Sequence, residues 1–260
     1  MTPEKTTKAF GWRVYGLGVM AIGLACVAFG NFDPGQPVPQ AIPARAALAY
    51  AAGVLMIAAA AAIQWRRTTA WGAAALTAYY ALIVVLLLNG RLLLAHYAEY
   101  GTYENLAEQL GIALGGLIIY AATANMDTAL SARLTRFAQL AFGACVLVWG
   151  GAHFVYMNLT APLVPKWLPP TQVFWGYATG TGFIAAGIAI LTGIQARLAA
   201  VVLTAMLASF TLLVHVRLLI ADPSAAFNWT ELAENLAILG ATWVVADSLS
   251  ERRPPRDGSS

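Results

Sequence analysis

The chain has 260 residues, of which 60% are hydrophobic and 10% are charged. Soluble domains are about 45–50% apolar and about 25% charged, so a soluble globular domain, a disordered chain and a disulfide scaffold are excluded. The formal net charge of +3 gives no sign of a nucleic-acid partner, and none is expected. The composition predicts an all-α integral membrane protein whose main partner is the lipid bilayer.

Long apolar segments follow one another along almost the whole chain. A membrane-spanning helix needs about 20 predominantly apolar residues. Trp and Tyr gather near the ends of these segments, as they do at membrane interfaces. We therefore expect eight transmembrane helices, at residues 11–30, 45–64, 69–95, 105–124, 134–157, 172–192, 197–221 and 230–248.

The Lys and Arg residues outside and at the ends of these spans divide unequally between the two sides. Eight spans place eleven of them on one side and four on the other. Cytoplasmic segments carry the excess of Lys and Arg. Both termini are therefore predicted to be cytoplasmic, in a bacterial inner membrane. The longer polar loops at 31–44, 96–104 and 158–171 and the turn at 222–229 then face outward.

The chain matches itself at an offset of 126 residues. An even number of spans in each half returns the chain to the same side, so the halves share one orientation. This arrangement predicts two tandem four-helix repeats, 1–126 and 127–260, related by a pseudo-twofold axis along the membrane normal. The matching blocks are 38–43 with 164–169, 91–95 with 217–221, and 106–110 with 232–236.

The first of these blocks contains two prolines in each half. Proline fixes φ and removes a backbone donor, so the stretch is not expected to be regular helix. Two interpretations stay open for residues 38–43 and 164–169. The stretch is either a short re-entrant cap, which needs protein or water around its backbone, or an ordinary rigid loop.

Each half also carries an Arg and a Glu separated by 17 residues, near the outer ends of neighbouring spans. Charges at membrane depth are costly and usually paired. We predict the structural ion pairs Arg91–Glu108 and Arg217–Glu234. In the alternative, each Arg extends to the interface and each Glu favours a helix N-terminus.

Departures from the internal symmetry indicate candidate functional residues. His153 takes the place of Val27, His215 that of Asn89, and Glu231 that of Asn105. These substitutions place protonatable groups near the outer membrane face, where a ligand site is expected. The candidate ligand-binding residues are His153, Tyr156, His215, Arg217, Glu231 and Glu234.

Several uses of this cluster are consistent with its chemistry. It could accept protons during quinol oxidation, ligate a haem through two histidines, bind a polar head group or ion, or simply form interhelical hydrogen bonds. The sequence contains no ligand motif of defined spacing. We therefore expect no metal or haem site, and no catalytic residue is assigned.

Four stretches of the second half form a recognisable pattern: Gly-Gly-Ala-His-Phe at 150–154, and residues 164–170, 179–187 and 234–240. Through them, about residues 135–248 resemble the DoxX-like family of small four-span membrane proteins. The resemblance implies a four-helix unit and marks His153 and segment 164–169 as candidate positions. It also links some members to quinone oxidoreduction and others to stress complexes or assembly.

The leading hypothesis is a membrane subunit of a quinone-linked electron-transfer system with a site near the outer leaflet. Such a subunit would have no redox cofactor of its own and would need a bound quinone and other membrane or redox-complex subunits. Two alternatives stay open, a non-enzymatic membrane scaffold or assembly factor, and a small-solute transporter with a cavity between the halves. Whether the chain itself is an enzyme is undecided at this point.

Overall fold

The computed structural model describes the backbone of residues 3–249 and the side chains of residues 10–249. Every regular element in this part of the chain is a helix, which confirms the predicted all-α class. The elements are α1 (Pro3–Phe29), α2 (Arg45–Ile63), α3 (Thr69–Ala78), η1 (Tyr79–Asn89), α4 (Gly90–Ala95), α5 (Tyr100–Thr123), α6 (Thr128–Val155), α7 (Met157–Thr160), η2 (Ala161–Leu163), α8 (Gln172–Thr192), α9 (Ala196–Phe210), η3 (Thr211–His215), α10 (Val216–Ala221) and α11 (Ala226–Ser248).

Seven helical stretches among the described residues are long and apolar enough to cross a membrane. One runs continuously through α3, η1 and α4, and another through α9, η3 and α10. Large apolar side chains cover their outer surface, with Trp71 and Leu94 79% and 83% exposed. Such a surface would aggregate in water and is suited to lipid, as expected for an integral membrane protein.

The eighth expected span corresponds to α11, which is not among these seven stretches. This helix has 23 residues but includes the polar residues Glu231, Glu234 and Asn235. Six consecutive residues, 237–242, are buried, so every face of the helix is covered at that level. A helix enclosed by protein does not need a wholly apolar surface, which explains its lower hydropathy. The eight-span topology stays a prediction.

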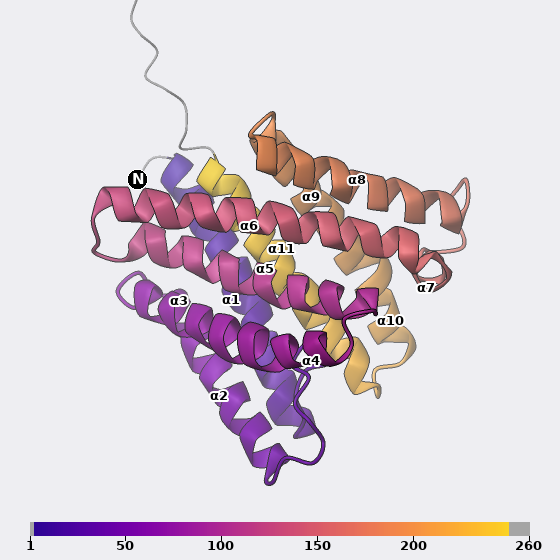
Figure 1. The fold of residues 1–260 in the computed structure, drawn as a ribbon, viewed down its shortest axis with the longest axis horizontal. Helices are drawn as coiled ribbons and strands as arrows, with labels where there is room; N and C mark the ends of the chain where they lie inside the picture. The colour runs from indigo at the N-terminus through magenta and orange to yellow at the C-terminus, as the bar shows by residue number, and fades with distance from the viewer. Residues whose placement is uncertain (1–2, 250–260) are drawn as a thin grey trace, which may run out of the picture.

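The helices pack so that the two halves of the chain are interleaved (Figure 1). Helix α6 lies between α5 and α8, and α1 lies against α2 and α11. Helices α5 and α11 also contact each other. The first long helix of each predicted repeat therefore packs on the last helix of the other, α1 on α11 and α6 on α5.

Two local arrangements recur 126 residues apart. Arg91 donates a hydrogen bond from Nη2 to the carbonyl oxygen of Pro37 at 3.3 Å, and Arg217 donates one from Nη2 to that of Leu163 at 2.9 Å. The π-helical segments η1 and η3 end at Asn89 and His215, which are also equivalent. Each Arg thereby ties the loop or short helix that follows the first span of its half to the end of the third.

The predicted ion pairs Arg91–Glu108 and Arg217–Glu234 are wrong. No such pair occurs among the described side chains, because each guanidinium extends outward to a loop carbonyl instead. The carboxylate of Glu234 accepts a hydrogen bond from Nε2 of Gln109. Both arginines are exposed at the end of the bundle, as in the alternative interpretation of the sequence.

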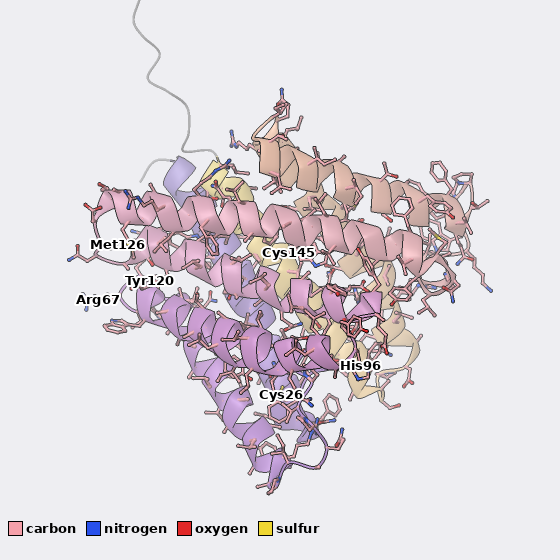
Figure 2. All side chains as sticks on the ribbon, viewed as in Figure 1. Cys26, Arg67, His96, Tyr120, Met126 and Cys145 are labelled. Carbon is pink, nitrogen blue, oxygen red and sulfur yellow. The ribbon has the colours of Figure 1, made fainter. Side chains whose placement is uncertain are left out.

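The orientation prediction requires the loops expected to face the cytoplasm and those expected to face outward to lie at opposite ends of the bundle. Figure 2 places Arg67, Tyr120 and Met126 toward one end and His96 toward the other. The assignment of the first end to the cytoplasm stays a prediction. The side chains of Lys5, Lys8, Arg252, Arg253 and Arg256, which contribute to it, lie outside the described residues.

Glycines bring α1 and α11 into backbone contact. A Cβ added at Gly18 would collide with the backbone of Leu236 and Ala237, and one at Gly240 would collide with the backbone of Val14 and Tyr15. Backbone atoms of a packed helix cannot move aside as a side chain can. The close approach of these two helices therefore depends on glycine at both positions.

We expect Gly18→Ala to destabilise the protein by about 1–3 kcal/mol, the usual cost of overpacking a tight interior. The matched control is Gly182→Ala in α8, where a new Cβ would meet only the Met206 Sδ atom at 3.5 Å. Thermal unfolding of both variants in the same detergent measures the effect. Equal melting temperatures for the two variants would contradict the proposed role of Gly18.

Candidate functional site

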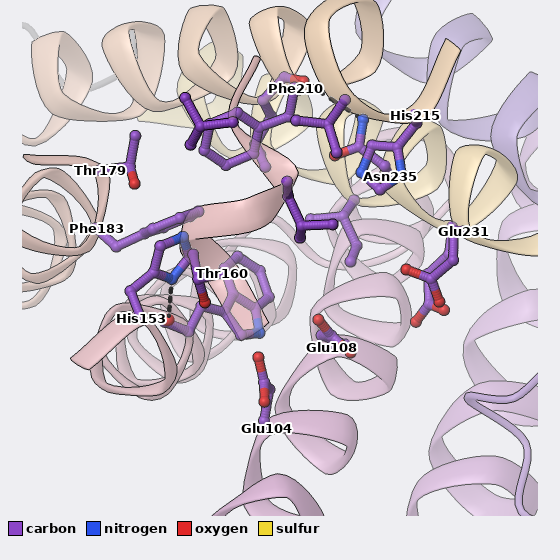
Figure 3. A pocket seen from close by; sticks show the side chains of 17 residues that line it. Glu104, Glu108, His153, Thr160, Thr179, Phe183, Phe210, His215, Glu231 and Asn235 are labelled. Carbon is purple, nitrogen blue, oxygen red and sulfur yellow. Dashed lines mark hydrogen bonds between the residues drawn. The ribbon is translucent and has the colours of Figure 1, made fainter. Parts of the chain in front are cut away.

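A pocket of about 240 Å³ lies between the helices of the second half and α5 of the first (Figure 3). It is near the end of the bundle where α5 and α11 begin. Helices α5, α6, α8, α9 and α11 contribute to its walls, together with the short segments η2 and η3. The lining residues are Glu104, Glu108, Trp149, His153, Thr160, Leu163, Val164, Thr179, Phe183, Leu207, Phe210, Val214, His215, Glu231, Glu234, Asn235 and Ile238.

Four of the six candidate ligand-binding residues line this one pocket: His153, His215, Glu231 and Glu234. They come from α6, η3 and α11, which are far apart in the sequence. His153 and His215 lie on opposite sides of the pocket, and Glu231 is on the side of His215 (Figure 3). The substitutions that break the internal symmetry are therefore brought together in space.

Tyr156 and Arg217 are not lining residues. The Tyr156 hydroxyl oxygen accepts a hydrogen bond from the backbone N–H of Gly101 at 2.8 Å. Its ring also lies edge-on to that of Tyr100, with centroids 6.4 Å apart. Tyr156 thus contacts the first turn of α5 from the end of α6. Arg217 instead donates a hydrogen bond to the Leu163 carbonyl.

The sequence interpretation missed Glu104 and Trp149 and assigned Glu108 to an ion pair. Glu104 and Glu108 are four residues apart on α5 and share one helical face. Trp149 is one turn before His153 on α6, a spacing that also indicates a common face. Helical spacing could therefore have suggested all three, but only the packing of α5 against α6 brings them to one pocket.

Aromatic rings form one wall of the pocket. The rings of His153 and Phe210 are stacked at 26° with centroids 6.5 Å apart, and Phe183 contacts both, at 5.1 Å and 6.1 Å. Trp149 meets Phe183 edge-on at 6.2 Å. Flat apolar walls of this kind favour a planar, partly apolar ligand.

Two buried nitrogen atoms of the lining have no hydrogen-bond partner in the described part of the chain. They are Nε1 of Trp149, whose side chain is only 5% exposed, and Nδ1 of His215. The indole of Trp149 packs on α5, where a Cβ at Gly111 would lie 2.9 Å from its Cζ2 atom. Buried donors are rarely left unpaired, since each costs free energy. The unpaired indole N–H therefore indicates a ligand that offers an acceptor.

Four carboxylates, those of Glu104, Glu108, Glu231 and Glu234, face the same space. Between residues 10 and 249 no Lys or Arg forms an ion pair with any of them. Carboxylates that face a pocket without a cationic partner need protons or donor groups from a ligand. No cluster of three metal-ligating side chains that could hold an ion occurs within this same range.

The corresponding region of the first half is filled by its own chain. Asp33 and Gln36, in the loop after α1, are each 1% exposed, and Gln36 accepts a hydrogen bond from the Tyr79 hydroxyl at 2.6 Å. The loop thus enters the protein interior. The residues that enter are 33–36, which precede the predicted stretch. Only Val38 is buried within 38–43 and only Pro165 within 164–169, which agrees with the alternative interpretation of an ordinary loop.

Asp33 connects this loop electrostatically with the pocket. Burial raises its pKa from the ordinary value of 3.8 to about 7, and the negative charge of Glu231 adds to the increase. The backbone N–H of Gly35 donates to its Oδ2 at 3.1 Å, which opposes the shift. Near pH 6 the buried carboxyl group is therefore mainly protonated.

The comparison with family models gives one match, to a domain of unknown function (DUF8561), over residues 142–244. The matched region lies wholly within the second predicted repeat and includes most of the pocket lining. The search of curated proteins and the search of solved structures gave no match. The resemblance to DoxX-like proteins thus stays a prediction.

Asp33 should make thermal stability depend on pH. Between about pH 4 and 7 the folded protein keeps a proton that the unfolded chain has lost, so this contribution to stability falls as pH rises through that window. Asp33→Asn mimics the protonated form and should lose less stability between pH 5 and 8. Melting temperatures across this range measure the difference.

The control for this prediction is Asp222→Asn. Asp222 is fully exposed, and hydrogen bonds from Ser224 lower its pKa, so it stays ionised across the whole range. Its variant should have the same pH dependence as the unmodified protein. If the melting temperature of Asp33→Asn depends on pH in the same way as that of the unmodified protein, the pKa of Asp33 is not raised and the prediction is wrong.

Proposed function

We propose that the chain is a membrane subunit of a quinone-linked electron-transfer system and that the pocket binds the head group of a quinone or quinol. The observation that carries this proposal is the unpaired, buried indole N–H of Trp149 beside an aromatic wall and four carboxylates. The ligand must be planar, must accept a hydrogen bond, and in one state must donate hydrogen bonds.

A quinone meets each of these requirements. Its flat ring suits the walls formed by Phe183, Phe210 and His153. Its oxygens accept hydrogen bonds in both redox states, and the hydroxyl groups of a quinol donate to carboxylates. A simple ammonium ion would satisfy the carboxylates but would leave the Trp149 N–H unpaired. A scaffold needs no such pocket, so the site favours ligand binding.

The proton chemistry of the pocket fits quinol oxidation. In that reaction a quinol loses two electrons and two protons and becomes a quinone. The carboxylates and histidines of the lining are the proton acceptors. The chain has no redox cofactor of its own in this proposal, so both electrons pass to the redox centre of a partner subunit.

The proposal includes the topology expected from the sequence. It has eight spans in two repeats, 1–126 and 127–260, about a pseudo-twofold axis, with both termini in the cytoplasm of a bacterial cell and the pocket near the outer leaflet. Its support is the recurrence of the Arg91–Pro37 contact as Arg217–Leu163 and of the π-helical ends at Asn89 and His215.

Binding of a short-chain ubiquinone to the purified protein in lipid nanodiscs tests this function. We expect Trp149→Phe to weaken binding about tenfold, because it removes one hydrogen bond in a dry site while keeping an aromatic ring. Trp71→Phe is the control, since Trp71 is 79% exposed on the outer surface and far from the lining. Calorimetry or thermophoresis gives both affinities.

The proposal fails if the unmodified protein binds neither ubiquinone nor menaquinone analogues under these conditions. It also fails if Trp149→Phe and Trp71→Phe bind the quinone equally well. Mass spectrometry of gently purified protein adds an independent measurement, because a retained quinone would be detected directly.

A further inference from the structure

The first half of the chain contains its own substitute for a ligand. The loop after α1 presents the carbonyl oxygen of Gly35 to Nδ2 of Asn89 at 3.1 Å and to Nδ2 of Asn105 at 3.5 Å. Asn105 also donates to Oδ1 of Asn89 at 2.7 Å. Asn89 is fully buried and its amide also donates to the carbonyl oxygen of Val84 at 3.0 Å, so the Gly35 carbonyl takes the second hydrogen of the same Nδ2 atom.

The equivalent positions in the second half carry different side chains and lack that carbonyl. Asn89 corresponds to His215 and Asn105 to Glu231, and both of the latter line the pocket. Gly35 corresponds to Ala161, whose carbonyl oxygen accepts from the backbone N–H of Val164 at 3.1 Å within a turn. Nδ1 of His215 has no partner among the described residues.

The two loops also differ at the residue that presents the carbonyl. A Cβ at Gly35 would collide with the side-chain amide of Gln109 on α5, so glycine lets the first loop lie close to α5 without displacing that amide. The counterpart of Gly35 is Ala161, which has that Cβ, and the counterpart of Gln109 is Asn235. Ala161 is also buried, but residues 161–163 form the short helix η2, and Leu163 lines the pocket.

We infer that an oxygen atom of the bound ligand occupies, between His215 and Glu231, the position that the Gly35 carbonyl occupies in the first half. This inference rests on the proposed function and specifies it, because it assigns one quinone oxygen to two residues that bind it directly. His215 donates from Nδ1 to this oxygen in either redox state, and Glu231 accepts the hydrogen of a quinol hydroxyl group. Each chain then has one quinone site.

The exchange of side chains fits this assignment. Two asparagines suit a permanent carbonyl, because an amide donates a hydrogen bond but takes up no proton near neutral pH. A histidine and a glutamate can hold an oxygen and also receive its proton. The second half has no carbonyl at this position and carries His215 and Glu231 instead, which are the groups that a ligand with a changing protonation state requires.

Infrared difference spectroscopy tests the inference with ubiquinone carrying ¹³C at one carbonyl or at the other. A hydrogen-bonded carbonyl vibrates at lower frequency than a free one. We expect one labelled carbonyl to lose its lowered frequency in His215→Leu and to keep it in His215→Asn, which keeps an N–H donor. The other carbonyl, which the Trp149 N–H binds, should stay lowered in both variants. Binding should weaken about tenfold in His215→Leu.

Asn89→Leu is the matched control in the first half. It removes the equivalent hydrogen bond to Gly35, so it should lower the melting temperature and leave the carbonyl spectrum unchanged. If His215→Leu does not fold, His215→Asn and Glu231→Gln are compared instead. The infrared O–H band of the bound quinol is measured in the reduced state. This band should change in Glu231→Gln and stay unchanged in His215→Asn.

The outcomes separate this inference from the proposed function. If the unmodified protein binds no quinone, the proposed function fails and the inference fails with it. If quinone binds but neither carbonyl frequency changes in His215→Leu, the inference is overturned and the function stands. For the alternative pair of variants, an unchanged O–H band in Glu231→Gln overturns it in the same way.

Discussion

The structure depends on enclosing two helices that carry carboxylates, α5 and α11, inside a bundle whose outer surface contacts lipid. Ionisable groups are costly at membrane depth unless protein or water surrounds them. The glycine contacts of α1 with α11 and the packing of α6 on α5 supply that enclosure. Because each of these contacts joins the first helix of one half to the last helix of the other, the halves are not independent. A pocket lined by both follows from this interleaving.

The internal comparison of the sequence located much of the site. His153, His215 and Glu231 differ from their equivalents Val27, Asn89 and Asn105, and all three line the pocket. This works because a duplicated fold keeps what packing requires in both halves, so unequal positions are free to serve binding. The same comparison could not identify Glu104, since its importance comes from the contact of α5 with α6 across the halves.

The ion-pair prediction failed for a physical reason that spacing does not reveal. Arg91 and Arg217 lie at the end of the bundle, where their long side chains reach loop carbonyls at little desolvation cost. Glu108 and Glu234 lie deeper, facing the interior. Sequence separation placed each Arg and Glu at neighbouring helix ends but did not show that they point in different directions. The helical class and the long apolar spans followed from composition alone, while the enclosure of α11 required the packing.

The two halves show how one fold can hold a closed site and an open one. In the first half a glycine lets the loop enter and satisfy Asn89 with a backbone carbonyl, so that region is complete without a ligand. In the second half the corresponding loop stays at the edge, and the pocket keeps an unpaired indole N–H, an unpaired imidazole nitrogen and several carboxylates. A site that served only for packing would lose these groups at no cost, since apolar side chains of similar volume would be more stable there. The ligand proposed for this pocket would account for their presence together, because it accepts hydrogen bonds, donates them and fits between aromatic rings.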